Sequence, residues 1–395
     1  MLKPLKAIMN STIKLLVVYD NFFPAYKAGG PIQSLTNLVL SLQKKIEIAV
    51  FTSGYDLITS QPVNEIKKDV WSQIYLPGSN VVVKVWYAGI NNTARPAFNR
   101  CLEEVKPSVV YLNGMFSFRY VIIPLFCIKR KKIKLVLCPR GMLQTGALAG
   151  KSLKKKLYLS LLKMSGLVKN VVWHATNQEE ERDIKRIFWK DSTIIIAKNI
   201  PKKPLSEIRC TAKVSGKLRL VHLSLIHEIK NLLQVIGIVA KSGEGITLDI
   251  YGPVSDPVYW KKCSQLMEKT PGKIKYKGEL LPSMVQQKFC EYDASILLSK
   301  GENFGHALYE SLSSGRPVIT SYFTPWNDLE EKKAGWNFDI ANNGNCIDAL
   351  EAICSIPADS FDEYCKAAWK LAKEYYAAAA DLSNYDKLFS INLKR

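Results

Sequence analysis

Apolar runs alternate with helix-like patterns along the first half of the chain. The runs are continuous rather than alternating with polar residues, and they cover residues 13–19, 46–52, 81–86, 108–112, 134–138 and 171–175. Continuous apolar runs indicate strands that are buried on both faces of a sheet. We therefore expect an α/β fold in which helices cover both sides of a parallel sheet.

A polar segment at 202–217, rich in Lys, Pro and Ser, interrupts this pattern. A second series of apolar runs follows, at residues 218–223, 247–251, 274–276, 294–298 and 317–321. The repetition predicts two Rossmann-like domains, 1–200 and 201–375, whose sheets face each other across a deep cleft that binds ligands. The last segment, 376–395, is expected to form a helix that packs back on the first domain.

The composition is that of a globular protein with more than one core. Of 395 residues, 47% are hydrophobic and 23% are charged, and this length exceeds that of one ordinary domain. The nine cysteines include no Cys-x-x-Cys pair. This spacing argues against a zinc site and a disulfide framework, and it favours a reducing, cytoplasmic setting.

No segment has the pattern of a signal peptide or a membrane-spanning helix. The N-terminus carries Lys3 and Lys6 but then runs through polar residues 10–12 into a strand pattern, without an apolar signal-peptide core. The longest uncharged apolar run, 120–128, contains Pro124 and is far shorter than the roughly 20 residues that span a bilayer. We expect a protein that does not cross the membrane.

The net charge of +20 is concentrated in the first half of the chain. Residues 1–200 hold 30 Lys and Arg against 12 Asp and Glu, a net charge of +18, whereas residues 201–395 hold 25 against 23, a net charge of +2. Such an excess favours a polyanionic partner, either an anionic membrane surface or nucleic acid. Because the sequence lacks the aromatic-basic motifs of nucleic-acid-binding folds, we expect no nucleic-acid partner and favour the membrane.

A basic, amphipathic pattern at residues 151–163 agrees with a membrane partner. Leu153, Leu157 and Leu161 are four residues apart beside a lysine cluster, and a second basic run lies at 129–134. A helix of this kind can lie on an anionic leaflet. The alternative is an ordinary helix whose leucine stripe faces the core of the first domain.

The densest cluster of candidate chemistry follows the apolar run at 294–298. It comprises Gly301, Glu302, Asn303, Phe304, Gly305, His306 and Glu310. A strand, a glycine turn and a helix start together form a phosphate-binding geometry, because free backbone N–H groups and the helix dipole point at the anion. The carboxylates of Glu302 and Glu310 can accept hydrogen bonds from the hydroxyl groups of a sugar and a ribose.

This cluster resembles glycosyltransferase family 4, also called glycosyl transferases group 1, in which a Glu-x7-Glu motif precedes a small-residue helix and a Gly-x-Pro-Val strand. The match runs through Glu302, Phe304, Gly305, Glu310, Gly315, Pro317 and Val318. The resemblance implies the GT-B fold and retaining transfer of a sugar from a nucleotide-diphosphate-sugar. It also implies that Glu302 contacts the transferred sugar, that Glu310 holds the donor ribose, and that the start of the helix, with Asn303 and His306, binds the donor.

The segment 222–232 resembles the part of the same family in which an arginine and a lysine bind the donor diphosphate. Lys230 matches the lysine, and together with Asn231 it is expected at the diphosphate, where a fixed ammonium stabilises the leaving group without a metal. Leu225 stands where the family usually has the arginine. This difference leaves open a second function, that of a non-catalytic nucleotide-sugar-binding subunit of a glycan-assembly complex.

Loops of the first domain complete the predicted site. Gly29 and Gly30 resemble the family's Gly-Gly loop, which lies against the donor phosphates. Asn113, Arg140 and His174 end or follow apolar runs at the same expected sheet edge, where we place the acceptor side. Arg140 is a candidate for the missing catalytic cation or, alternatively, for a structural salt bridge, and His174 faces either the cleft or the core.

The segment around Arg140 is similar to a variant found in lipopolysaccharide, capsule and exopolysaccharide enzymes of the family. It implies a saccharide or polyprenyl-diphosphate-linked acceptor in bacterial surface glycan biosynthesis. Since no Asp-x-Asp clamp occurs in a suitable loop, we expect neither a metal nor another cofactor. We expect the protein in the cytoplasm, peripheral on the inner face of the cell membrane.

Overall fold

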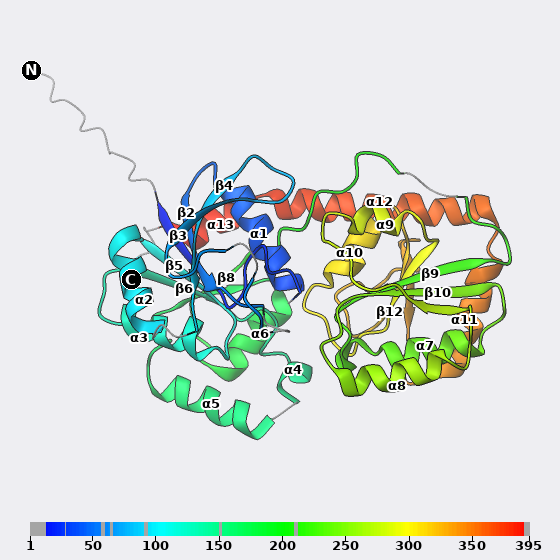
Figure 1. The fold of residues 1–395 in the computed structure, drawn as a ribbon, viewed down its shortest axis with the longest axis horizontal. Coiled ribbons are helices and arrows are strands. Elements are labelled where there is room, and N and C mark those ends of the chain that lie inside the picture. Colours follow the sequence, from blue (N-terminus) through cyan, green and yellow to red (C-terminus); the bar gives the residue numbers. More distant parts are fainter. Residues whose placement is uncertain are drawn as a thin grey trace, which may run out of the picture.

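The computed structural model describes residues 13–27, 29–56, 60–63, 66–90, 94–149, 152–208 and 212–390. Several residues used in the predictions above lie outside the described residues: Lys3, Lys6, Lys151, residues 209–211 of the polar segment and the last five residues of the tail. The described residues form two sheets, one in each half of the chain, which stand side by side (Figure 1).

The sheet of the N-terminal half has eight strands, in the order β3-β4-β2-β1-β5-β6-β7-β8. The strands are β1 (Lys14–Val18), β2 (Glu47–Ser53), β3 (Trp71–Tyr75), β4 (Val82–Ala88), β5 (Val109–Asn113), β6 (Lys134–Cys138), β7 (Val172–Ala175) and β8 (Ile194–Ile196). Every pair is parallel except β3 with β4. All six strands predicted in this half are present, and β3 and β8 extend the two edges.

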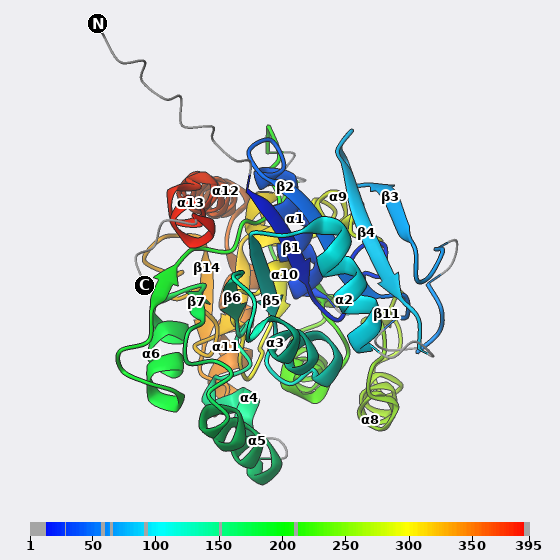
Figure 2. The ribbon, with the colours of Figure 1, turned by 90° about the vertical axis from the view of Figure 1, so that its left-hand side faces the viewer.

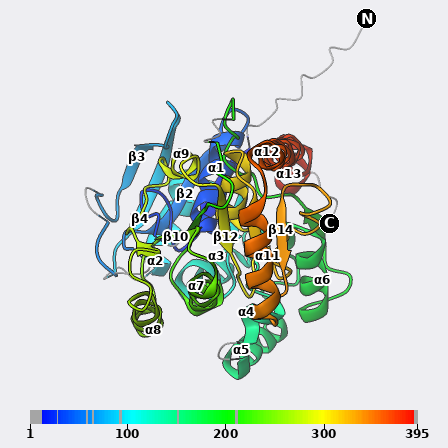
Figure 3. The ribbon, with the colours of Figure 1, turned by 90° about the vertical axis from the view of Figure 1, so that its right-hand side faces the viewer.

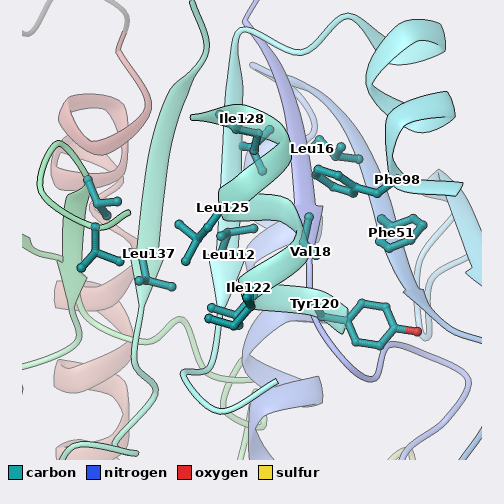
Figure 4. Close-up of a cluster of buried hydrophobic side chains, with 14 of the residues drawn as sticks. Leu16, Val18, Phe51, Phe98, Leu112, Tyr120, Ile122, Leu125, Ile128 and Leu137 are labelled. Carbon is teal, nitrogen blue, oxygen red and sulfur yellow. The ribbon is translucent and has the colours of Figure 1, made fainter. Parts of the chain in front are cut away.

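Helices cover both faces of this sheet, as predicted for strands buried on both sides. Along β1, Leu16 and Val18 pack into a cluster with α2 (Ala94–Val105), the π-helix η1 (Phe118–Ile122), α3 (Ile123–Ile128), α5 (Ser152–Met164) and α6 (Gln178–Ile187). Figure 4 shows part of this cluster. Leu15 and Val17, which point the other way, pack with α1 (Gly30–Leu42) and α13 (Ser383–Phe389). The short helix α4 (Thr145–Ala149) precedes α5.

The sheet of the C-terminal half has six parallel strands, in the order β11-β10-β9-β12-β13-β14. These are β9 (Leu218–Leu223), β10 (Ile246–Tyr251), β11 (Ile274–Tyr276), β12 (Ala294–Leu297), β13 (Val318–Ser321) and β14 (Gly335–Phe338). The helical elements are η2 (Glu228–Lys230), α7 (Leu232–Lys241), α8 (Pro257–Met267), α9 (Val285–Phe289), α10 (His306–Ser313), α11 (Asn343–Ser355) and α12 (Ala358–Ala380). Figure 3 views this half from its end, with α7 beside α11.

The last two helices tie the halves together. Helix α12 packs Ala368 and Ala372 against the α10 side of the C-terminal half and runs along the top of the molecule toward the N-terminal half (Figure 1). Helix α13 then buries Tyr385, Leu388 and Phe389 in the core of the N-terminal half, and it lies beside the first sheet in the end view (Figure 2). The end of the described chain is therefore part of the first core.

Candidate functional site

The start of α10 is fixed by aromatic packing beneath it. Gly305, the residue before the helix, has φ of 74°, a left-handed conformation that glycine adopts without strain. Phe304 is 6% exposed, its ring lies 5.7 Å from that of Trp326, and the Trp326 indole donates to the Phe304 carbonyl at 2.6 Å. No side chain caps the first turn of α10. The helix therefore begins with backbone N–H groups that an anion can satisfy.

Lys230 and Glu302 meet where β9 and β12 end. Asn231, with φ of 59°, turns the chain between η2 and α7, and the backbone N–H of Lys300 donates to the Ile229 carbonyl at 2.8 Å. This bond holds the two loops together. The Lys230 ammonium then lies 2.5 Å from a Glu302 carboxylate oxygen, with side chains 22% and 11% exposed. One cation and one carboxylate thus lie together at the carboxyl edge of the second sheet.

Glu310 lies inside α10 and is 3% exposed. Burial raises the pKa of its carboxyl to about 7, against the opposing effects of the Lys202 charge and the Gln33 hydrogen bond. The Gln33 amide, from α1 in the other half of the chain, donates to the carboxylate at 3.0 Å. A buried carboxylate with one neutral donor retains capacity for further donors, such as ribose hydroxyls.

The Gly-Gly segment brings α1 against α10. A Cβ atom on Gly30 would lie 2.7 Å from the His306 ring, so only glycine allows this approach. The Ser34 hydroxyl and the His306 Nε2 atom are 2.7 Å apart. Burial, together with the charges of Arg140 and Lys230, lowers the pKa of His306 to about 3. His306 is therefore neutral at physiological pH and contacts the first half instead of carrying a charge.

Asn303 makes a second contact between the halves. Its side-chain amide donates to the Thr176 hydroxyl at 3.1 Å, and its backbone carbonyl accepts from the Asn177 side-chain amide at 3.5 Å. A Cβ atom on Gly141 would lie 2.7 Å from the Asn303 Cβ atom. Another contact between the halves joins the loops after β1 and β11, where the Lys27 ammonium lies 3.1 Å from the Glu279 carboxylate. The two carboxyl edges are thus held face to face.

The sequence did not single out Gln33, Ser34 or Thr176, which make these contacts. Gln33 and Ser34 are polar positions near the start of an amphipathic helix, a pattern that any solvent-exposed helix start shares. Their role depends on partners more than 270 residues away, because |i−j| is 277 for Gln33 with Glu310 and 272 for Ser34 with His306. A single sequence gives no signal for such pairs.

Asn113, Arg140 and His174 form an internal network and not an open acceptor surface. Arg140 is 9% exposed, and its guanidinium donates to Asn113 at 3.0 Å, to the Tyr111 hydroxyl at 3.0 Å and to Asn199 at 2.6 Å. Asn113 is 0% exposed. The structure thus buries residues at which we predicted an open acceptor side, and an acceptor contact there stays a prediction. None of these bonds is the salt bridge that was the alternative for Arg140, and its predicted contact with a phosphate stays a prediction.

His174 also belongs to this network and is 0% exposed. Its Nδ1 atom lies 2.7 Å from the Tyr111 hydroxyl, and its Nε2 atom lies 2.8 Å from the Ala197 carbonyl. Burial and the Arg140 charge lower the pKa of His174 to about 3. The neutral ring therefore donates from Nε2 and accepts at Nδ1, and of the two alternatives for His174 the structure has the core position.

Asn231 and Leu225 lie beside Lys230. Asn231 is 7% exposed, and its amide donates to the Gln234 side chain in the first turn of α7. This bond assigns the Asn231 side chain to the start of α7, and its predicted diphosphate contact is untested. Leu225 is partly buried and supplies no charge to the site.

In the described part of the chain, no three His, Cys, Asp or Glu side chains are grouped so that they could hold a metal ion. Within the same residues, no helix has the length and apolar character needed to cross a bilayer.

Comparison with known proteins identifies the fold. No family model and no curated protein sequence matches the chain. Several solved structures do match. Sucrose-phosphate synthase from Thermosynechococcus elongatus matches at 14% identity, with a TM-score of 0.74 over 95% of this chain and 99% of that one. HepE from Anabaena, in complex with UDP and glucose, matches at 13% identity, with a TM-score of 0.68 over 95% and 99% of the two chains.

A glycosyltransferase from Rickettsia africae also matches, at 12% identity, with a TM-score of 0.63 over 96% of this chain and 99% of that one. These similarities extend over nearly the whole of each chain, so they concern both halves and their arrangement. The chain has the two-sheet GT-B fold of these glycosyltransferase structures, as predicted. At such identities the likeness establishes the fold alone.

Proposed function

We propose that the chain is a retaining glycosyltransferase that moves a sugar from a nucleotide-diphosphate-sugar to a saccharide or lipid-linked saccharide. The observation that carries this proposal is the grouping of Lys230, Glu302, Glu310 and the uncapped start of α10 at one sheet edge. A cation, an anion-binding helix start and two carboxylates match the parts of a nucleotide-diphosphate-sugar. That HepE has been solved with UDP and glucose supports the same class of donor.

In this proposal the donor lies on the C-terminal half, which we take as one domain from residue 201 to about 375. The diphosphate lies between Lys230 and the start of α10, Glu310 accepts the ribose hydroxyls, and Glu302 orients the sugar. Gly29 and Gly30 allow the first domain, residues 1–200 together with α13, to approach the phosphates. Resemblance to family 4 supports these roles.

The proposed reaction occurs on one face of the sugar. The bond between the anomeric carbon and the donor phosphate oxygen breaks. The acceptor hydroxyl oxygen bonds to the anomeric carbon on the same face, and the hydroxyl proton passes to an oxygen of the leaving phosphate. Lys230 and the backbone N–H groups of α10 stabilise the negative charge on the leaving diphosphate. This scheme needs no carboxylate nucleophile and no metal ion. We further propose that the product is a bacterial surface glycan precursor, made at the inner face of the cell membrane.

Leu225 favours a second candidate function, a nucleotide-sugar-binding subunit without activity. The side chain carries no charge where the family usually has an arginine, and Arg140 bonds within the first half. A subunit of this kind would bind a nucleotide but would not turn over a donor. The two functions therefore differ in one measurable property, the release of nucleoside diphosphate.

The test is transfer from a panel of UDP- and GDP-sugars to a polyprenyl-diphosphate-linked monosaccharide, with the product's anomeric configuration read by NMR. We expect nucleoside diphosphate release and retained configuration. Lys230→Ala is expected to remove roughly 2–4 kcal/mol of transition-state stabilisation, which lowers the turnover rate about 30- to 1,000-fold. The exposed control Lys261→Ala is expected to keep the wild-type rate. Nucleotide binding without turnover would support the binding subunit, and inversion would overturn the retaining reaction.

A further inference from the structure

Helix α5 presents two apolar faces, and only one of them packs. Leu159 and Leu162 are both 4% exposed and belong to the core cluster under the first sheet. The side chains of Leu153, Leu157, Leu161 and Met164 are 80%, 61%, 57% and 81% exposed. Residues four apart lie on the same side of a helix. The three leucines that the sequence pattern singles out therefore form an open stripe, and the alternative in which they face the core is wrong.

Lysines flank this stripe on both sides. A helix turns about 100° per residue, so Lys154 falls on one side of the line through the leucines and Lys156 on the other, and both are exposed. Lys163 lies on the Lys156 side and donates to the Ile187 carbonyl at 3.2 Å. Helix α5 contains no Asp or Glu. A further exposed basic run, residues 129–132, ends α3 on the same face of the sheet.

We propose that α5 docks on an anionic lipid bilayer. The helix lies in the plane of the interface, with Leu153, Leu157, Leu161 and Met164 at the acyl boundary and the flanking lysines at the headgroups. Charge complementarity selects this partner, because an apolar stripe with lysines on both sides fits a surface that is apolar inside and negatively charged outside. A second copy of this face would bring like charges together.

The position of α5 connects this surface with the sheet edges. The Lys155 ammonium donates to the Ala147 carbonyl of α4 at 2.5 Å, and a Cβ atom on Gly146 of α4 would lie 3.9 Å from the Lys300 carbonyl oxygen. Lys300 precedes Glu302 by two residues. Figures 1 and 2 show α5 at the periphery of the N-terminal half, with α4 beside it. If the proposed function holds, a docked α5 keeps the site close to an acceptor that is anchored in the bilayer.

The experiment is co-sedimentation of the full chain with vesicles of phosphatidylcholine alone and of phosphatidylcholine with phosphatidylglycerol. We expect binding to the phosphatidylglycerol vesicles that weakens with added salt. The triple variant Leu153→Gln/Leu157→Gln/Leu161→Gln is expected to lose at least about tenfold in affinity, because each exposed leucine gives up its insertion. Lys154→Gln/Lys156→Gln is expected to weaken binding and reduce its salt dependence.

The matched control is Val258→Gln/Leu281→Gln, which alters exposed apolar side chains of the C-terminal half, 72% and 51% exposed. It is expected to bind vesicles as the wild type does. Absence of wild-type binding, or unchanged binding of the triple leucine variant, would overturn the proposal. So would a wild-type dimer that the triple variant converts to a monomer, because the stripe would then be an interface between copies. None of these readouts requires donor turnover, so a failure here is distinct from a failure of the proposed activity.

Discussion

Glu310 is buried, although its proposed role at the ribose requires an ionised carboxylate. Its carboxyl is buried in α10, and burial raises its pKa to about 7. A ribose that donates hydrogen bonds to this group would favour the ionised form and lower the pKa again. Donor affinity should therefore rise with pH from about 6 to about 8.

The same shift predicts how stability depends on pH. The pKa of the Glu310 carboxyl rises from 4.5 in the unfolded chain to about 7 in the fold, so the unfolded chain releases this proton first as the pH rises. The free energy of unfolding therefore falls between pH 4.5 and 7, by on the order of 3 kcal/mol from this group. Urea unfolding of Glu310→Gln, compared with wild type at several pH values, should show the variant gaining relative stability over this range. Parallel curves would contradict the prediction.

Gly30→Ala tests the contact between α1 and α10. The added Cβ atom would lie 2.7 Å from the His306 ring, which the Ser34 hydroxyl also contacts. Overpacking of this kind costs about 1–3 kcal/mol, so we expect a lower free energy of unfolding and weaker nucleotide binding. Gly344→Ala, in α11, meets only the Asn342 side chain at 3.5 Å and should change neither quantity by more than about 1 kcal/mol. Equal effects in the two variants would argue against the contact.

At this scale, the sequence predicted residues whose chemistry depends on local order along the chain. Lys230 and Glu302 follow strands β9 and β12, and Glu310 lies in the helix after β12. Because the strands are parallel, all three residues lie at the same edge of the sheet. Asn113, Arg140 and His174 lie at or near strand ends at the corresponding edge of the first sheet, but they bond into the core. Strand position alone does not determine whether a side chain at a sheet edge points toward a ligand or toward its neighbours.

At the scale of elements, the crossover between the halves is held by side chains from separate parts of the chain. Each of residues 197–200 accepts one such hydrogen bond. The Ala197 carbonyl accepts from His174, and the Lys198 carbonyl accepts from Tyr385. The Asn199 side chain accepts from Arg140, and the Ile200 carbonyl accepts from Asn37. Tyr111 connects Arg140 with His174 in this arrangement. These bonds fix the direction in which the chain leaves β8.

Tyr111→Phe should weaken this crossover without touching the proposed donor site. The change removes the partner of both the Arg140 guanidinium and the His174 Nδ1 atom, and buried groups without partners cost about 1–3 kcal/mol each. We expect a loss of that order in the free energy of unfolding, measured by urea denaturation, while nucleotide affinity stays within about twofold. The control Tyr75→Phe alters a side chain that is 69% exposed and should be neutral. A large loss of nucleotide affinity in Tyr111→Phe would contradict this prediction and indicate that Arg140 takes part in nucleotide binding.

Most strands could be predicted because their apolar runs are long and buried on both faces. The three that were missed lack this pattern for separate reasons. Strand β3 is an antiparallel edge strand whose Trp-Ser-Gln-Ile-Tyr sequence mixes polar and apolar residues. Strand β8 has three residues, and β14 begins with a glycine and contains an asparagine. Edge and very short strands carry a weak sequence signal.

At the scale of the whole molecule, the chain crosses between the halves twice. It leaves the first sheet after β8 and returns through α12 to place α13 in the first core. The sequence indicated a returning helix only in outline, because aromatic residues near the end of the chain can pack on either half. The stability of the N-terminal half therefore depends on residues that follow the entire C-terminal half.

Phe389→Ala measures this dependence. The ring is 0% exposed and lies 5.4 Å from the ring of Tyr111 in the first core. Removing a buried aromatic ring costs about 3–5 kcal/mol, so we expect a loss of that order in the free energy of unfolding, followed by urea denaturation. The control Phe126→Ala removes a side chain that is 59% exposed. Equal, small losses in the two variants would show that α13 contributes little to the first core.

The central claim, that the facing sheet edges bind a nucleotide-diphosphate-sugar, is tested most directly by thermal shift of the full chain. UDP, GDP, CMP, ADP and dTDP are compared at millimolar concentration, with and without EDTA, in wild type, Lys230→Ala and the control Lys261→Ala. A bound nucleotide raises the melting temperature by mass action. We expect that one nucleoside diphosphate stabilises the wild type and the control, that EDTA leaves this shift intact, and that Lys230→Ala reduces it. No shift with any nucleotide, or an equal shift in Lys230→Ala, would contradict this claim.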